Sequence, residues 1–489
     1  MTDSFNLITE PWLPVTDLET GQPTDVSLDE ALTQAHRVRL SADGYLQEAV
    51  LLRLLLAVFD AAAGPIDTAD WVTAWRAETL DADRIGDYLE TWAHRFDLLD
   101  PDAPAFQHSA IAAPTRPADT LLPTQLGGSA TAWFLGPHGK KGPIGLAASA
   151  RYLLERLACD GSGIKAKPGG GRTYGAHPGP LHQAVHAHLV GRTLKDMLLL
   201  NLPPQPRAEG DAPVWERPEA PVLPGRVRPI TGRLDWLTWP ARTLRLFAED
   251  GTITGLAWHD GDRPDAYPRG LDPTTAWRYL DDTIRRLSLP AQPQRIPAHF
   301  PAAVLLDDTI PNHRAWSPVV DHLIAHSAYL DPKASIGIVL CLPHLNSHAT
   351  TITGIDTASV WLASGADLAD PVRRRLLGAA AWHRAATAGA LANALNRVWR
   401  SFLRDDSAHY PQLEASLADY WSATEHDFTA IFDGDGPAGE HDPKMTNAFI
   451  RTGLGIYDMA FQSHTSRMSH ILLIEQHRGP IMRGWRSEQ

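Results

Sequence analysis

The chain has 489 residues, of which 44% are apolar, with 16 tryptophans and a formal net charge of −13. This length and apolar share predict a folded protein of two or three domains. The negative charge excludes indiscriminate binding to nucleic acid, because Lys and Arg make the phosphate contacts and an acidic surface repels the polymer. Any nucleic-acid site must therefore be local.

The cysteines and the N-terminal residues indicate a cytoplasmic location. Cys159 and Cys341 are too few and too far apart in the sequence for a disulfide framework or a thiolate zinc site, which is typical of a reducing compartment. The N-terminus shows no cationic flank followed by an apolar signal run. The most apolar stretch, 49–64, is interrupted by Arg53 and Asp60, so we expect a buried helix and no membrane partner.

Up to about residue 365 the sequence predicts helices mixed with short strands and irregular connectors. Helical periodicity covers 45–62 and 145–159, and Pro- and Gly-rich segments separate the elements. This pattern is typical of a mixed α/β domain rather than of a helical array.

The stretch 165–180, KAKPGGGRTYGAHPGP, combines glycines and cations and contains no acidic residue. Its candidate binding residues are Lys165, Lys167, Gly169, Gly170, Gly171 and Arg172. Because glycine has no Cβ, its N–H groups can approach a polyanion closely, and the neighbouring cations would supply the attraction. An ordinary surface loop is the alternative, since Gly and Pro also mark loops.

A further helix is predicted over 182–201, and its start contains histidines at a spacing that resembles a zinc site. His182 and His186 are four residues apart, and His177 and His188 are nearby. The position of the general base holds Gln183, which cannot accept and deliver a proton at neutral pH. Because this base is missing, we expect no catalytic residue. A metal-dependent hydrolase built on these four histidines stays as an alternative interpretation.

The clearest hairpin is 242–260, because Asp250-Gly251 lies between two runs of β-branched and aromatic residues. From about residue 370 the pattern changes to long helical segments separated by short polar loops, namely 370–403, 411–432 and 442–465. We predict an α+β fold with a large mixed N-terminal domain, 1–365, that has irregular loops and short β-hairpins. An antiparallel four-helix bundle, 366–489, follows it.

Charged residues are distributed unevenly along the chain. Three stretches are basic, 138–142, 165–172 and 224–245, whereas acidic side chains gather over 405–442. Most charge runs are solvated surface, so a basic stretch alone does not identify a binding site.

The opening segment FNLITEPWLPV, Phe5 to Val15, resembles the start of the large subunit of the type I-E CRISPR Cascade complex, the CasA family. Further segments resemble the family in the family's order, namely GGSATAWFLG (127–136), PGGGRTYG (168–175), GPLHQAVHAHLVGRTLKDMLLLNLP (179–203), GRLDWLTWPARTLRL (232–246) and the terminal helices. The resemblance covers essentially the whole chain.

This resemblance implies a non-catalytic subunit that recognises the protospacer-adjacent motif in double-stranded DNA and helps to open the duplex for guide-RNA pairing. The implied partners are other Cascade subunits, the CRISPR guide RNA, the DNA target and the Cas helicase-nuclease that it docks. No cofactor is implied, and because the chain lacks the cysteine cluster of some relatives, we expect no structural zinc. An interaction scaffold without nucleic-acid contact is a further alternative, which fits the acidic net charge.

The resemblance also assigns site residues. The glycine loop would lie against the duplex, with Lys165, Lys167 and Arg172 on phosphates. LNSHATT (345–351) resembles the family's wedge hairpin, which makes Asn346, Ser347, His348, Ala349 and Thr350 candidates to separate the first base pairs. His348 stands where a glutamine is expected. Trp133 or Phe134 would anchor the subunit at the guide-RNA end by stacking.

Overall fold

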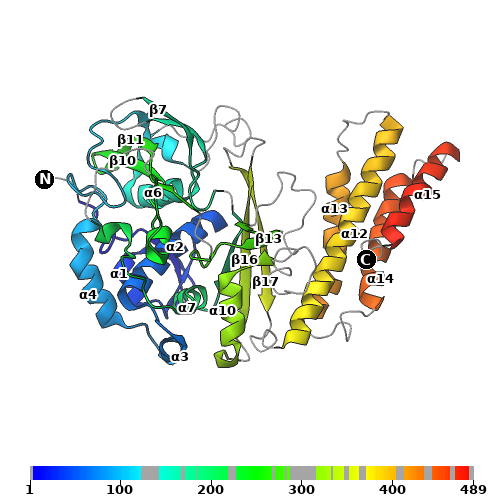
Figure 1. The fold of residues 1–489 in the computed structure, drawn as a ribbon, viewed down its shortest axis with the longest axis horizontal. Helices are drawn as coiled ribbons and strands as arrows, with labels where there is room; N and C mark the ends of the chain where they lie inside the picture. Colours follow the sequence, from blue (N-terminus) through cyan, green and yellow to red (C-terminus); the bar gives the residue numbers. More distant parts are fainter. Residues whose placement is uncertain are drawn as a thin grey trace.

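The computed structural model describes residues 4–122, 142–166, 171–182, 184–217, 227–266, 270–280, 283–286, 315–331, 334–345, 352–362, 370–403, 412–433, 443–462 and 468–483. Figure 1 shows a mixed helical and stranded part on the left, a long hairpin at the centre and a group of long helices on the right. The predicted α+β fold, with a C-terminal four-helix bundle, is confirmed.

Helix α2 (Tyr45–Ala63) forms the centre of the N-terminal core, as the apolar run predicted. All of its residues from Ala49 to Phe59 are buried, and α4 (Ala82–Trp92), α6 (Leu146–Cys159), α7 (Leu194–Asn201) and α8 (Arg233–Leu237) pack against it. Arg53 is tolerated inside this core because its guanidinium forms an ion pair with the buried Asp272. No single described helix is long and apolar enough to cross a membrane. Helices α2 and α3 (Thr68–Arg76) together meet the length and hydropathy criteria, but they are bent by 106° relative to each other.

The helix predicted over 182–201 is wrong in its first half. Residues His186–Val190 form strand β8, which pairs with β16 (Ile336–Leu345), and α7 begins only at Leu194. The reason is local: the Thr193 side chain accepts from the Asp196 N–H, and the Asp196 carboxylate accepts from the Thr193 N–H. This reciprocal cap fixes the helix start and leaves the preceding residues free to join a sheet.

The central hairpin joins β16 to β17 (Ile352–Leu362) and is antiparallel along its whole length. The register runs from Ile336 opposite Leu362 to Leu345 opposite Ile352, with an irregularity between His344 and Leu345. Strand β8 pairs with the other edge of β16. The wedge candidates of the sequence fall between Leu345 and Ile352, the facing ends of these two strands, and the strands stand between the two parts of the molecule (Figure 1).

The hairpin predicted at 242–260 is confirmed as β10 (Arg242–Glu249) and β11 (Thr252–Asp260). Its turn places Asp250 at φ 48° and Gly251 at φ 71°, both in the left-handed region. Two consecutive residues with positive φ form a type I′ turn, which matches the twist of paired strands and favours the sequence Asp-Gly.

The C-terminal bundle consists, within the described residues, of α12 (Pro371–Leu403), α13 (Gln412–Asp433), α14 (Pro443–Phe461) and α15 (Met468–Arg483). Helix α12 contacts the other three, and the bundle has a hydrophobic core of its own. Leu376 and Ala380, near the start of α12, pack instead into the larger N-terminal core. Phe428 of α13 and Phe449 of α14 also belong to that larger core, and the domain boundary near 365 stays a prediction.

A buried aromatic cluster joins α3 to α10 (Pro318–His326). Trp71 Nε1 and His322 Nε2 both donate to the carbonyl oxygen of Leu199, at 2.8 and 3.0 Å. The two rings meet edge to face, with centroids 5.2 Å apart. Burial, together with the neighbouring His326, lowers the pKa of His322 from 6.5 to about 3.

This shift predicts that acid destabilises the protein. The unfolded chain binds a proton at His322 below pH 6.5 and the folded chain does not until about pH 3, so stability is lost as the pH falls through this window. The expected loss is about 1.4 kcal/mol for each pH unit below 6.5. Urea unfolding between pH 5 and 7.5 measures it. In His322→Gln, which keeps a donor but cannot titrate, the curve should be flatter by this amount; an equal pH dependence would contradict the assignment.

Candidate nucleic-acid interface

The glycine run falls in the sequence between two paired antiparallel strands, β6 (Gly163–Ala166) and β7 (Arg172–Ala176), which form the glycine hairpin. Lys165 is opposite Thr173, and Ala166 is opposite Arg172. Lys167, Gly169 and Gly170 lie outside the described residues. Gly171 adopts a φ of 85° in open space, so a side chain there would be strained even though nothing blocks it.

Lys165 points back into the protein rather than out to solvent. Its Nζ lies 2.8 Å from the carboxylate of Asp160, and only 14% of its side chain is exposed. Although burial acts to raise the pKa of Asp160, the charges of Arg242, Lys165 and Arg156 hold that pKa well below its usual value. The ammonium of Lys165 is thus committed to an internal carboxylate, which argues against the phosphate contact expected for it.

Arg242 fixes both ends of this hairpin. It is the first residue of β10, and its side chain is completely buried. Its guanidinium donates to the carbonyl oxygen of Gly161, before β6, at 2.6 Å, and to that of His177, after β7, at 2.7 Å. It also donates to the Asp160 carboxylate. One side chain therefore holds the two feet of the hairpin against the end of α6.

The other described arginines of the basic stretch 224–245 are also turned inward. Arg233 donates to the Asp60 carboxylate at 2.6 Å. Arg228 forms an ion pair with Asp235 at 2.7 Å, and its guanidinium stacks on the ring of Trp239. The sequence suggested solvated surface or a binding patch; both interpretations are wrong for Arg228, Arg233 and Arg242, because these three pair with carboxylates. Arg245 donates instead to backbone carbonyl oxygens. Of the basic stretch 138–142, the structure describes only the last residue.

The first-loop candidates Trp133 and Phe134 lie outside the described residues, but both ends of their loop are described. Strand β4 (Arg116–Pro117) precedes the loop and β5 (Ile144–Gly145) follows it, and both pair with β11. Strand β11 also contacts β6 of the glycine hairpin. Two segments that the sequence analysis singled out separately are therefore rooted on the same strand.

The wedge candidates Asn346 to Thr350 also lie outside the described residues. The strands that carry them are described to Leu345 and from Ile352, and Leu345 packs against the N-terminal hydrophobic core. The base of this tip is therefore anchored in the larger part of the molecule.

The histidines do not form a metal site. His182 and His186 are not on a helix: His182 Nδ1 is 2.9 Å from the carbonyl of Cys159, and His186 Nε2 is 3.1 Å from that of Leu181. His188 Nε2 lies 2.9 Å from the Glu48 carboxylate. Among the described residues no three His, Cys, Asp or Glu side chains are grouped so that they could hold a metal ion. The hydrolase interpretation therefore lacks its site in this part of the chain.

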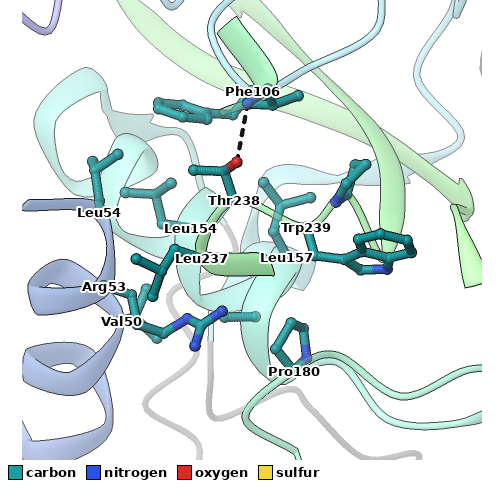
Figure 2. A pocket seen from close by; sticks show the side chains of 13 residues that line it. Val50, Arg53, Leu54, Phe106, Leu154, Leu157, Pro180, Leu237, Thr238 and Trp239 are labelled. Carbon is teal, nitrogen blue, oxygen red and sulfur yellow. Dashed lines mark hydrogen bonds between the residues drawn. The ribbon is translucent and has the colours of Figure 1, made fainter. Parts of the chain in front are cut away.

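A cavity of about 60 Å³ lies between α2, α6 and the segment 237–240. Figure 2 shows that its lining is mostly apolar, with Arg53 projecting from α2 and Thr238 accepting a hydrogen bond from the Val214 N–H at 3.0 Å. Arg53 is the charged residue of the lining, and its guanidinium is already paired. The cavity holds no nucleophile beside a base, so it offers no catalytic arrangement.

The sequence profile described as CRISPR-associated protein Cse1 matches residues 6–451. The chain belongs to the Cse1 family. The resemblance inferred from the sequence is therefore confirmed. A CRISPR-associated protein CasA/Cse1 of Thermus thermophilus is 36% identical to this Cse1 chain over 275 residues, which is 54% of the chain and 53% of the relative. The matched chain thus spans about half the length of that curated relative.

Solved structures share the fold over nearly the entire Cse1 chain. The structure of Thermus thermophilus CasA (Cse1) is 26% identical, has a TM-score of 0.78 and covers 98% of this chain and 100% of its own. A chain of a CRISPR RNA-guided surveillance complex has a TM-score of 0.83 at 21% identity, with 98% and 99% covered. At the latter identity the likeness shows the fold alone.

Sequence reasoning missed Asp160 and Arg242 in this Cse1 chain. An acidic residue directly after the apolar helix 145–159 was a visible signal, because it ends the periodicity. Arg242 gave none, since its partner lies 82 residues away in the sequence.

We expect Lys165→Met to destabilise the fold by about 1–2 kcal/mol, because it removes one buried partner of Asp160 while Arg242 and Arg156 remain. Arg172→Met, at an exposed position of the same hairpin, should stay within about 0.5 kcal/mol of the wild type. Urea unfolding of both variants measures the difference. Equal effects would contradict the internal role of Lys165.

Proposed function

We propose that this Cse1 chain is the non-catalytic large subunit of an RNA-guided surveillance complex. It recognises the protospacer-adjacent motif in double-stranded DNA, helps to open the duplex for guide-RNA pairing and docks the helicase-nuclease. Its partners are the other Cascade subunits, the guide RNA and the target DNA. The cytoplasm is its compartment, in keeping with the two buried free thiols, Cys159 and Cys341.

The observation that carries this proposal is the glycine hairpin with its clamped root. A backbone that reads a groove must approach the duplex closely, which glycine permits, and must also hold a fixed position, which glycine does not provide. Arg242 and Asp160 supply the fixed position by holding both feet of β6–β7. Arg172, exposed at the start of β7, supplies a cation beside the tip.

The remaining site residues act at neighbouring steps. Trp133 or Phe134 anchors the subunit at the guide-RNA end. The strands on both sides of this loop, β4 and β5, pair with β11. The segment 346–350, at the tip of β16–β17, separates the first base pairs. An acidic chain restricts its contacts with DNA to such local elements, and base pairing to the guide supplies the sequence specificity.

Gly170→Asp tests the proposal in the assembled complex. The side chain would hold the backbone away from the groove, and its carboxylate would repel the phosphates, so binding to target duplex should weaken by at least about tenfold. An electrophoretic mobility shift with motif-bearing duplex measures this. Gly86→Asp, in α4, where an added Cβ meets open space, is the matched control and should bind as the wild type does. Wild-type affinity of the Gly170 variant would refute the role of the loop.

His348→Ala tests the wedge. A wedge replaces stacking that costs a few kcal/mol per step, and it matters only while the first base pairs are closed. We expect about tenfold weaker binding to closed duplex and near-complete rescue when those pairs are melted in advance by mismatches. His426→Ala, an exposed position on α13, controls for loss of a histidine. Equal impairment on both targets, or none on either, would leave 346–350 as a simple turn.

A further inference from the structure

Arg116 is an exposed cation at the root of the first loop. It begins β4 and pairs with Leu256 of β11. Its guanidinium carbon lies 4.2 Å from the centre of the Trp258 ring, which is also on β11. Among the residues that the structure describes, no carboxylate forms an ion pair with it. Arg116 is thus held by an aromatic ring, and no described carboxylate neutralises its charge.

A second guanidinium lies against the same ring. Arg156 of α6 is 4.9 Å from the centre of Trp258 and 3.4 Å from the Asp160 carboxylate. Burial lowers the pKa of Arg156, and the charges of Arg242 and Arg116 add to that effect against the attraction of Asp160. Arg116 therefore belongs to the same charge cluster as the clamped root of the glycine hairpin.

This cluster carries surplus positive charge. Its described cations are Arg116, Arg156, Lys165, Arg242 and Arg263. The four cations other than Arg116 share two buried carboxylates, Asp160 and Asp260, and Asp119, in the short helix Ala118–Leu121 that contacts α6 and β11, is a third buried carboxylate nearby. Glu155, beside Arg156, adds only part of a negative charge near neutral pH because burial raises its pKa to about 7. Charges enclosed by low-dielectric protein are poorly screened, so the excess reaches the surface.

The glycine hairpin lies next to this cluster, because both contact strand β11. Strand β11 carries Trp258, pairs with Arg116 through β4 and contacts β6 of the hairpin. In Figure 1 β7, β10 and β11 lie together at the upper left of the molecule, far from α3 at its lower edge. In a chain of net charge −13, a local positive excess beside a glycine tip has the charge complementarity that a polyanion requires.

We propose that Arg116 binds a backbone phosphate of the target duplex beside the glycine hairpin, with Trp258 orienting its guanidinium. A guanidinium stacked on an aromatic face keeps its N–H edge free, and that edge matches the two oxygens of a phosphate. Because Lys165 is held by Asp160, Arg116 is the cation of this cluster that is available at the surface. This inference rests on the function proposed above.

The test is the salt dependence of binding, measured with the reconstituted complex and a fluorescent motif-bearing duplex between 50 and 200 mM salt. Arg116→Gln should reduce the slope of log K against log salt by about 0.9, the value for one phosphate contact. Over this range the advantage of wild type over the variant should then shrink by about 3.5-fold. Arg116→Lys, which keeps the charge, should retain the slope. Arg76→Gln, exposed on α3 at the far edge, should leave slope and affinity unchanged.

The possible failures are distinguishable. An unchanged slope for Arg116→Gln, with normal wild-type binding, would overturn only the contact between Arg116 and a DNA phosphate. Arg116 would then only pack on the Trp258 ring. Loss of the variant subunit from the guide-RNA complex with an unchanged DNA slope would also overturn it, in favour of an RNA contact. A wild-type complex that showed no preference for motif-bearing duplex would overturn the proposed function and the contact together.

Discussion

Arg242 is the contact on which the candidate interface depends. Its buried guanidinium donates to one carbonyl on each side of the glycine hairpin and to the carboxylate that ends α6. Hydrogen bonds from a charged donor are stronger than neutral ones, and in a buried site water does not compete for them. The glycine hairpin, whose glycines restrict the backbone least, is thereby held at both of its ends. The segment 232–246 thus contacts the ends of the hairpin through the side chain of Arg242.

Several arginines of this protein are buried and paired with carboxylates. Arg53, Arg233 and Arg242 are all buried, and each is joined to a carboxylate from a distant part of the chain. Removing one member of such a pair leaves an uncompensated buried charge, so these contacts fix which segments meet. The net charge of −13 counts these buried pairs together with the surface residues, so it does not describe the charge of any one face.

The sequence predicted the features that depend on local rules. The bundle helices and the turn at Asp250-Gly251 follow from apolar spacing and turn chemistry, and both were found as expected. The helix over 182–201 failed because a capping box at Thr193 and pairing with β16 outweighed its periodicity. The clamp on the two ends of the glycine hairpin could not be read, because it depends on Arg242, far along the chain. The inward turn of Lys165 depends on the carboxylate of Asp160, whose burial the sequence does not show.

The clamp at the hairpin root has a consequence for how this family can diverge. Arg242 grips Gly161 and His177 through their carbonyl oxygens, a group that every residue carries, so the grip does not depend on which side chains stand at those two positions. The residues between Lys165 and Arg172 can accordingly be exchanged without removing a described contact of Arg242 or Asp160. A graft of another member's residues at 167–171 would then leave the contacts that Arg242 and Asp160 make with the ends of the hairpin as they are.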